Sequence, residues 1–307
     1  MDASQDASIE ALVHQAYCWI LGREGDPGGV AHYVESLRSG SIDERELRAI
    51  FVYSDEFQRQ MSDSTMAVDV GGFSVVIERE DPELGSYISR TGGWEPNIRQ
   101  AIRDNLPPGG VFVDVGANVG IMSFEASRIA SKVIAFEPHP RNAQNLRRGI
   151  EANCIPNIVL HQMGLSDSLR LITTTLATNA KVQPNAPNLA QAIDGDSLLH
   201  REDRIDLIKI DVEGHEPSVL AGLRKTIETH RPRLIVEFNP ACLGANGNDV
   251  AADLAREIFA FSQQVTPIEG DTCHDPIHTA DALLALWAAR AEARGPMLHF
   301  DLVTRPR

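Results

Sequence analysis

A glycine-rich turn after an apolar segment is the feature of this sequence that most clearly predicts chemistry. Residues 111–115 are apolar apart from Asp114, and Gly116, Asn118 and Gly120 follow them. Glycines between a strand and a helix allow the backbone to approach a ligand closely, and the amides that begin the helix can bind polar groups. We therefore expect a nucleoside-containing ligand to bind at this turn.

An acidic residue at the end of the next apolar segment supports this expectation. Glu137 ends the segment 132–137, where a carboxylate can accept hydrogen bonds from both hydroxyls of a ribose. A dinucleotide site would have the spacing G-x-G-x-x-G, whereas this turn has G-x-N-x-G with Asp114 ahead of it. The Asp114 carboxylate would repel a pyrophosphate but would suit the ammonium group of a methionine moiety.

A second group of ionisable residues occupies the segment 207–216, LIKIDVEGHE. Lys209 and Asp211 alternate along a strand and therefore share a face, whereas Glu213 and His215 lie on the turn into the next helix. A hydroxyl that acts as a nucleophile must lose its proton, so the reaction needs a base. His215 has a suitable ordinary pKa of about 6.5, and Asp211 and Glu213 are alternatives if burial raises their pKa values. Lys209 would neutralise the carboxylates around it.

A metal route is left open by the sequence but is not predicted. Asp211, Glu237 and Asn239 end two neighbouring strands and could present three oxygen ligands to Mg²⁺. Such an ion would orient and acidify a hydroxyl. The spacing of these residues in the sequence does not by itself indicate a metal site.

The cysteines also give no metal site. None of the four is paired at the spacing of metal ligands, and we expect reduced thiols. Cys273 lies beside His274 and near His278, but adjacent residues converge poorly on one zinc ion and no fourth ligand is evident. We therefore expect loop residues there.

The alternation of apolar segments predicts the elements that would position these groups. Strands are expected at 111–115, 132–137, 157–161, 205–211, 232–238, 264–268 and 298–304. Helices are expected near 94–105, 118–130, 140–152, 215–229, 248–262 and 277–293. Apolar strands that alternate with helices indicate an α/β fold with a mostly parallel, seven-stranded, Rossmann-like sheet.

The beginning of the chain has a different pattern. Apolar residues recur at spacings of three and four within residues 1–61, which predicts a small all-α domain. Residues 62–68 are expected to be a linker. The α/β domain would then occupy residues 69–307.

The composition limits the class of partner. The 307 residues carry a formal net charge of −15, so the chain lacks the basic excess of nucleic-acid binding proteins. We expect a small-molecule or glycan acceptor and no nucleic acid. No apolar run approaches the roughly 20 residues of a membrane helix, and the N-terminus lacks the features of a signal peptide. A cytoplasmic protein is therefore expected, and the sequence does not indicate an oligomeric state.

Several segments, in order along the chain, resemble the FkbM family of methyltransferases. They are Trp94–Pro96, Asp114–Gly120, Phe136–Pro138, Leu165–Asp167, Ile208–Glu216, Arg231–Pro232, Val236–Glu237 and Phe300–Leu302. The resemblance spans about residues 70–307 and implies a class I methyltransferase fold. It also implies S-adenosylmethionine as cofactor and O-methylation of a hydroxyl on a sugar, glycan or small natural product. The region 172–197 is less typical of the family, so the acceptor cannot be carried over.

The resemblance implies roles for individual residues. One group would hold the methionine part of the cofactor: Asp114, Gly116, Asn118 and Gly120. Glu137 would hold the ribose, Asp167 would lie near the adenine, and Glu95 would close the site from the preceding helix. Asp211 would lie at the reacting end, in contact with both cofactor and acceptor.

The N-terminal segment resembles a bacterial module known only as domain of unknown function 4214. Three separated blocks carry this likeness, Leu21–Arg23, Asp26–Gly29 and Ser54–Phe57. The resemblance implies no chemistry for this part of the chain.

Two other classes of protein stay open at this point. One is a cofactor-binding interaction protein without turnover, against which the intact segment Asp211–Gly214 argues. The other is an NAD-dependent dehydrogenase with an atypical loop, against which Asp114 and the G-x-N-x-G spacing argue.

Overall fold

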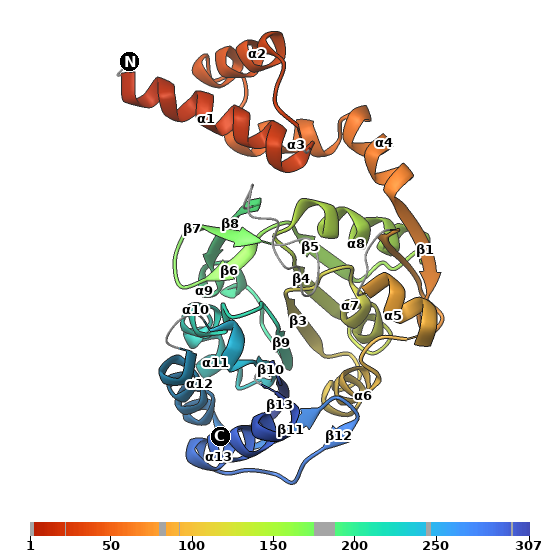
Figure 1. Ribbon diagram of the computed structural model, residues 1–307, viewed down its shortest axis with the longest axis vertical. Helices are drawn as coiled ribbons and strands as arrows, with labels where there is room; N and C mark the ends of the chain where they lie inside the picture. The colour runs from red at the N-terminus through yellow and green to blue at the C-terminus, as the bar shows by residue number, and fades with distance from the viewer. Residues whose placement is uncertain are drawn as a thin grey trace.

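A large twisted sheet forms the centre of the protein, shown in Figure 1 as a computed structural model that describes residues 3–21, 23–79, 84–91, 93–174, 188–243, 247–295 and 297–307. Its strand order is β12-β11-β13-β10-β9-β3-β4-β5. The strands are β3 (Val111–Val115), β4 (Lys132–Phe136), β5 (Ile158–His161), β9 (Leu207–Ile210), β10 (Arg233–Phe238), β11 (Ser262–Glu269), β12 (Thr272–Cys273) and β13 (Phe300–Pro306).

All seven strands expected from the sequence are present in this sheet. Strands β5, β4, β3, β9 and β10 pair in parallel, and β13 runs antiparallel to both β10 and β11. The mostly parallel sheet is the class I methyltransferase-like Rossmann arrangement that was expected, which confirms the fold class. The short edge strand β12 was not expected, because its two residues are exposed and have no apolar pattern.

Helices cover both faces of the sheet (Figure 1). One face packs against α6 (Pro96–Asn105), α7 (Ile121–Ser127) and α8 (Pro140–Ala152) in a core that includes Phe112, Phe124 and Leu146. The other face packs against α10 (Glu216–Gly222), α11 (Arg224–His230), α12 (Gly247–Phe261) and α13 (Ala280–Arg294). The single helix expected at 215–229 is therefore divided into α10 and α11, with Leu223 between them. The helix expected to begin at 118 begins at Ile121, because Asn118 and Gly120 have positive φ angles.

A smaller sheet lies beside the carboxyl end of β5. It consists of β6 (Gly164–Ser166), β8 (Asn188–Asp194) and β7 (Arg170–Thr174) in the order β6-β8-β7. The short helix α9 (Gly195–Leu199) follows β8. The sequence did not predict these strands, because they are short and carry no regular apolar alternation.

The first residues form the expected helical unit. Its helices are α1 (Ala3–Ile20), α2 (Pro27–Arg38), α3 (Glu44–Val52) and α4 (Asp55–Ser64), and they enclose a core of their own. Asp26 caps α2 by accepting from the Gly29 amide at 2.8 Å, and Asp43 and Glu46 form a capping box on α3. None of the helices in the described part of the chain has the length and apolar character that membrane crossing requires.

Residues 62–68 have regular structure, which corrects the expectation of a linker. Helix α4 continues to Ser64, and β1 (Thr65–Asp69) pairs antiparallel with β2 (Ser74–Glu78). The side chain of Arg141 on α8 donates to Ser64 Oγ at 2.7 Å. The polar residues before β1 suggested a boundary between two domains. Strand β1 nevertheless has a fixed conformation, because it pairs with the apolar strand β2. The division into domains near these residues stays a prediction.

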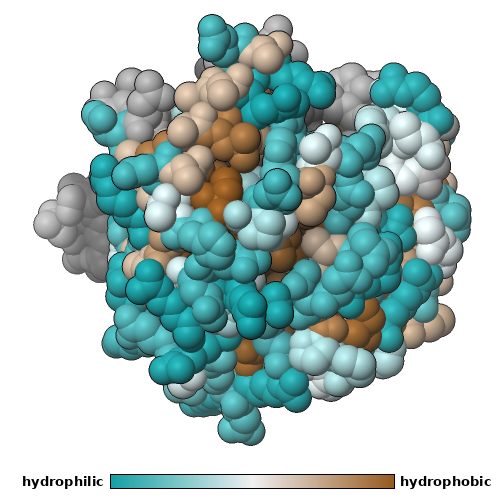
Figure 2. Space-filling view, turned by 90° about the horizontal axis from the view of Figure 1, so that it is seen from below, coloured by the Kyte–Doolittle hydropathy of each residue, from teal (hydrophilic) through white to brown (hydrophobic). Residues whose placement is uncertain are grey.

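The face of the molecule drawn in Figure 2 is mostly hydrophilic. Figure 2 shows one face on which hydrophilic side chains predominate and hydrophobic ones form a narrow band. A broad apolar surface of the kind that marks a permanent interface is not visible on this face.

We expect a chain that begins at Thr65 to fold, and one that begins at Val70 to be less stable by about 2–4 kcal/mol. The shorter chain loses every pair between β1 and β2, together with the packing of Met66 and Val68 against the core. Urea unfolding of both proteins, followed by circular dichroism, measures the difference. Equal free energies of unfolding would contradict a structural role for residues 65–69.

Candidate active site

The ends of four parallel strands bring the expected site residues together. Asp114 on β3 lies opposite Lys209 on β9 in the register of the sheet. Two residues earlier on the same strands, Phe112 and Leu207 also lie opposite each other, and both belong to the core beneath α6 and α7. Because side chains alternate along a strand, the polar pair continues this face toward the carboxyl edge of the sheet. Ligands bind at that edge in open α/β sheets.

The turn after β3 is shaped by the close approach of another strand end. Gly116 has φ of 84°, and a Cβ atom there would overlap the carbonyl oxygen of Asp211. Gly120 has φ of 92°, and a Cβ atom there would overlap the Leu146 side chain on α8. Asn118 also has a positive φ, of 49°. Glycine is therefore required at 116 and 120 for both backbone conformation and space.

Asp114 is fully buried and only partly satisfied. Its Oδ2 accepts a hydrogen bond from Ser123 Oγ at 2.6 Å, whereas its Oδ1 has no partner among the described residues. Burial raises the pKa of Asp114, and the charge of Lys209 opposes that effect. A buried acceptor without a partner is unfavourable by about 1–3 kcal/mol, so this oxygen fits a ligand that donates hydrogen bonds and carries positive charge. Ser123 was not identified from the sequence, because a serine in a helix carries no distinctive signal.

Glu137 ties the turn to the end of β4. Its Oε2 accepts from the Asn118 amide and its Oε1 from the His139 amide, each at 2.8 Å. Burial raises the pKa of Glu137 to about 7. The Asn142 side chain also donates to Glu137, so three of the four lone pairs of the carboxylate are used and one can still accept from a ribose hydroxyl. The position of Glu137 is therefore compatible with the expected ribose contact.

Lys209 is the cation of this site. It is 3% exposed, and its Nζ donates to Asp211 Oδ2 at 2.7 Å. Burial alone would lower the pKa of Lys209, but the charges of Asp211, Asp114 and Glu95 raise it above its usual value. Glu95 reaches the group from the start of α6, where it has φ of 41°, and burial raises its pKa to about 7. Four expected site residues from three parts of the chain therefore form one electrostatic cluster.

The turn after β9 is held by an internal hydrogen-bonded carboxylate. Glu213 and Gly214 have positive φ angles of 53° and 100°. Glu216 is buried, and its Oε1 accepts from the Val212 and Gly214 amides at 3.1 Å each. Glu216 therefore shapes the turn, while Glu213 contacts Cys242, whose Sγ lies 3.8 Å from Glu213 Oε2.

His215 and Asp167 form a separate group next to the carboxylate cluster. His215 Nε2 lies 3.0 Å from Ser166 Oγ, and Asp167 is exposed and pairs with Arg170 at 2.5 Å. Burial lowers the pKa of His215, and the charge of Arg170 lowers it further. The side chain of His215 is therefore neutral and is directed toward β6. Ser166 was not identified from the sequence.

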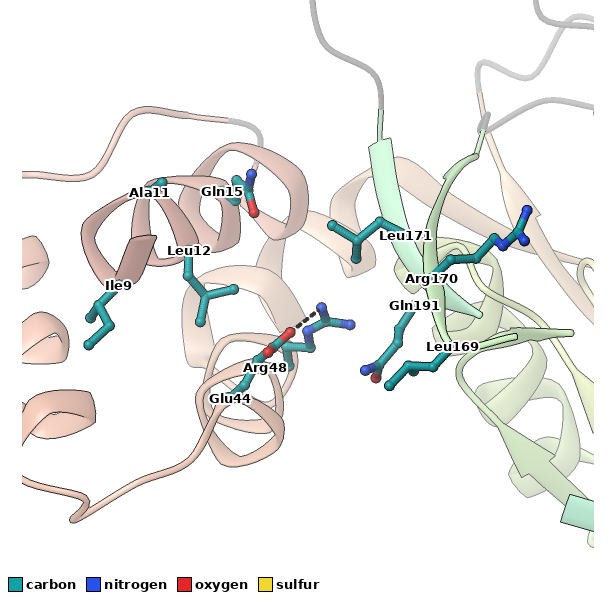
Figure 3. Close-up of a pocket in the computed structure, with 10 residues that line it drawn as sticks. All are labelled: Ile9, Ala11, Leu12, Gln15, Glu44, Arg48, Leu169, Arg170, Leu171 and Gln191. Carbon is teal, nitrogen blue, oxygen red and sulfur yellow. Dashed lines mark hydrogen bonds and ion pairs between the residues drawn. The ribbon is translucent and has the colours of Figure 1, made fainter. Parts of the chain in front are cut away.

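A cleft lies between the helical unit and the β6-β8-β7 sheet (Figure 3). Its volume is about 430 Å³, within the usual size of a ligand site. Figure 3 shows Leu12 and Arg48 of the helical unit across the gap from Leu171 and Gln191, whereas the Arg170 side chain points away from the gap. The residues that line the cleft are Ile9, Ala11, Leu12, Gln15, Glu44, Arg48, Leu169, Arg170, Leu171 and Gln191. Arg48 is already paired with Glu44 at 2.7 Å, and Arg170 with Asp167. Arg170 therefore links the cleft to His215 electrostatically, because the charges of Arg170 and its partner Asp167 both act on the pKa of His215.

The residues considered for zinc have other partners. His274 Nε2 lies 3.0 Å from Glu269 Oε2, and His278 Nδ1 lies 3.2 Å from the carbonyl oxygen of Gln263. Cys273 is exposed and belongs to β12. Within the described ranges, no three or more His, Cys, Asp or Glu side chains are arranged as the ligands of a metal ion.

Comparison with protein families gives two matches along the chain. Residues 114–260 match the methyltransferase FkbM domain, and residues 2–61 match the domain of unknown function DUF4214. The first match begins at Asp114 and includes Glu137, Lys209, Asp211 and the end of β10. Both resemblances inferred from the sequence motifs are confirmed.

Individual relatives have related descriptions. The hexuronic acid methyltransferase AglP of Haloferax volcanii is 28% identical over 216 residues, which cover 68% of this chain and 86% of that protein. The methyltransferase sdnD of Sordaria araneosa is 28% identical over 202 residues, which cover 49% of this chain and 78% of that protein. A crystal structure of a methyltransferase FkbM from Methylobacillus flagellatus KT aligns over 91% of this chain and 72% of that chain, with 18% identity and a TM-score of 0.42.

Gly116→Ala is expected to destabilise the protein more than Gly109→Ala, by at least about 2 kcal/mol. Both glycines have positive φ angles, 84° and 71°, so alanine introduces similar backbone strain at each. Only at residue 116 does the added Cβ overlap another strand end, whereas at residue 109 it meets no atom within 4 Å. Differential scanning calorimetry measures both variants. Equal losses would contradict the close approach of β3 and β9.

Proposed function

We propose that this chain transfers the methyl group of S-adenosylmethionine to a hydroxyl. Residues 114–260 match the methyltransferase FkbM domain, and residues 2–61, which precede them, match DUF4214. The acceptor would be a sugar, a glycan or a small natural product. The family match and the descriptions of the relatives support methyl transfer, and the residues at the strand ends support the cofactor.

The observation that carries the proposal is the partnerless oxygen of Asp114. A buried carboxylate oxygen beside a left-handed glycine turn suits an ammonium group, which would supply both a hydrogen bond and the opposite charge. A pyrophosphate at the same turn would add negative charge beside Asp114. The site therefore favours S-adenosylmethionine over NAD.

When bound, the cofactor would supply a sulfonium methyl group that a nucleophilic oxygen can accept. Asp114 would hold the ammonium end and Glu137 the ribose hydroxyls, so the methyl group would be presented near Asp211. Much of the rate enhancement of such a transfer can come from the alignment of the reacting atoms. The short contacts between β3, β4 and β9 would provide that alignment.

Asp211 is the residue that we place against the acceptor. Lys209 holds one of its oxygens at 2.7 Å, and the side chain of Asp211 is 27% exposed toward the strand-end region. The other oxygen can accept the proton of the acceptor hydroxyl as the new bond forms. His215 is the alternative base, on the opposite side of the turn with Ser166 as its neighbour. Burial and the charge of Asp211 raise the pKa of Glu213 to about 7, so Glu213 would carry only part of a negative charge at neutral pH.

The descriptions of the relatives suggest which classes of acceptor to test first. The protein from Haloferax volcanii is described as acting on hexuronic acid. We therefore propose a first screen of hydroxylated sugars, both neutral and acidic, with S-adenosylmethionine as methyl donor. Mass spectrometry of the products would detect methylation, and a folded protein that binds the cofactor but methylates nothing would favour the alternative of a binding protein without turnover.

Glu137→Ala is expected to weaken S-adenosylhomocysteine binding by a factor of about 10–100. The variant removes the acceptor for the ribose hydroxyls and also leaves the Asn118 and His139 amides without their partner. The control is an analogue that lacks both ribose hydroxyls. If Glu137 binds the ribose, calorimetry should find that the variant discriminates less between the two ligands than the natural protein does. Undiminished discrimination would rule out the ribose contact.

Asp211→Asn is expected to lower the rate of methyl transfer by a factor of about 10²–10⁴, with a much smaller effect on cofactor affinity. Asparagine keeps the shape of the side chain but removes the charge that Lys209 and the acceptor proton require. Asp203→Asn, an exposed position before β9, is the matched control and should have normal activity. An Asp211→Asn protein with the full rate would show that another residue, His215 first, acts as the base.

A further inference from the structure

The buried carboxyl groups of Glu237 and Asp301 have no role in the reaction described so far. Glu237 on β10 and Asp301 on β13 lie opposite each other in the antiparallel register. Glu237 is 7% exposed and Asp301 8%. Strand β10 also pairs in parallel with β9, where Val236 lies opposite Ile210. Glu237 and Asp211 are the next residues along the two strands, so they lie level with each other at the edge of the sheet. The pair therefore borders the place where we put the acceptor.

Two side-chain oxygens at this position lack partners. Glu237 Oε2 has none among the described residues, and the same is true of Oδ1 of Asn239, which is also 7% exposed. The Asn239 Nδ2 atom lies 3.5 Å from Glu237 Oε1, so the amide is turned toward the carboxyl group. An unpaired buried oxygen is unfavourable, and apolar residues would have filled this part of the sheet without that penalty. Two such atoms, on side chains that contact each other, indicate that a ligand supplies the missing donors.

The buried carboxylate of Glu269 has a purely structural role, and its hydrogen bonds can be compared with those of Glu237. Glu269, at the end of β11, is also 7% exposed, but Arg290 donates to both of its oxygens at 2.8 and 2.9 Å. His274 lies 3.0 Å from its Oε2. Both oxygens of Glu269 therefore have hydrogen-bond partners inside the protein, whereas Oε2 of Glu237 has none among the described residues.

The charges around Glu237 decide what kind of ligand fits. Burial first, and then the carboxyl groups of Asp211, Glu213, Glu216 and Asp301, raise the pKa of Glu237 above its usual value. A carboxyl group that holds a proton can both donate and accept hydrogen bonds. An acidic acceptor would bring a further negative charge next to Asp211, whose cationic partner Lys209 is already in use. A neutral group with several hydroxyls would satisfy Glu237 and Asn239 without adding charge.

We propose that Glu237 and Asn239 form the acceptor subsite, and that they hold two neighbouring hydroxyls of a neutral sugar while Asp211 faces the hydroxyl to be methylated. This inference rests on the proposed function and narrows its acceptor class. One hydroxyl would donate to Asn239 Oδ1, and another would exchange hydrogen bonds with the Glu237 carboxyl group. The hexuronic acid named for one relative would be a poor acceptor for this chain.

The test compares Glu237→Met with Glu269→Gln. Methionine approximately keeps the length of the side chain and removes the polar atoms, so the acceptor KM should rise by a factor of about 10 or more with a smaller change in kcat. The thermal stability should stay the same or rise, because a buried unpaired oxygen is lost. Glu269→Gln should do the reverse, with lower thermal stability and an unchanged acceptor KM. Affinity for S-adenosylmethionine, measured by calorimetry, should be unaltered in Glu237→Met.

The acceptor panel contains methyl glycosides of a neutral hexose, the matching hexuronic acid and the matching amino sugar. Higher kcat/KM for the neutral glycoside, by a factor of about 10 or more, supports the inference. Calorimetry of the same glycosides with S-adenosylhomocysteine-loaded protein gives a second measurement that does not depend on turnover.

Four results would overturn the inference. They are preference for the hexuronic acid, preference for the amino sugar, an unchanged acceptor KM in Glu237→Met, and no binding of any member of the panel. The first three leave methyl transfer itself intact, so the proposed function would stand. A natural protein that does not bind S-adenosylmethionine, or that binds it and methylates no acceptor, would remove both.

Discussion

The buried ammonium group of Lys209 is the interaction on which the rest of this site depends. It lies among Asp211, Asp114 and Glu95, which come from β9, β3 and the start of α6. Removing one partner from such a buried ionic group typically destabilises a protein by about 3–5 kcal/mol, because the remaining charges are left uncompensated. The register that places Lys209 opposite Asp114 is therefore tied to the stability of the sheet as well as to its chemistry.

One lysine cannot neutralise all the acids at this edge. Asp114, Glu95, Glu237 and Asp301 all have raised pKa values, and burial is the largest cause in each case. Such groups must hold protons or receive positive charge from a ligand. This excess of acid over base is compatible with a cationic cofactor beside a neutral acceptor. Dipoles and charges that are fixed before the substrate arrives need little rearrangement during the reaction.

The helical unit is connected to this edge through a different set of contacts. Its own core is separate, and the cleft beside β7 and β8 is where its side chains face the α/β part of the chain. Arg170 lines that cleft and pairs with Asp167, and both charges act on His215.

The sequence by itself determined the large sheet and the cofactor turn. The central strands β3, β4, β9 and β10 are largely apolar and buried on both faces, so they gave a strong signal. The glycines at 116 and 120 and the acids at 114 and 137 lie within short motifs, whose residue types and spacing can be read directly from the sequence. Local spacing is enough to predict features of that kind, and DUF4214 and FkbM motifs were recognised in the same way.

Only the tertiary structure decided which distant groups share the site. Asp301 lies 90 positions after Asp211, and nothing in its surroundings in the sequence indicates that it faces Glu237 across a strand pair. His215 and Lys209 are close in the chain, yet the turn after β9 directs one toward Ser166 and the other toward Asp114. Strand β1 was taken for a linker because its partner, not its own residues, gives it structure. In each case the deciding factor is a long-range contact, and its energy depends on burial and on the charge of a partner that local sequence does not specify.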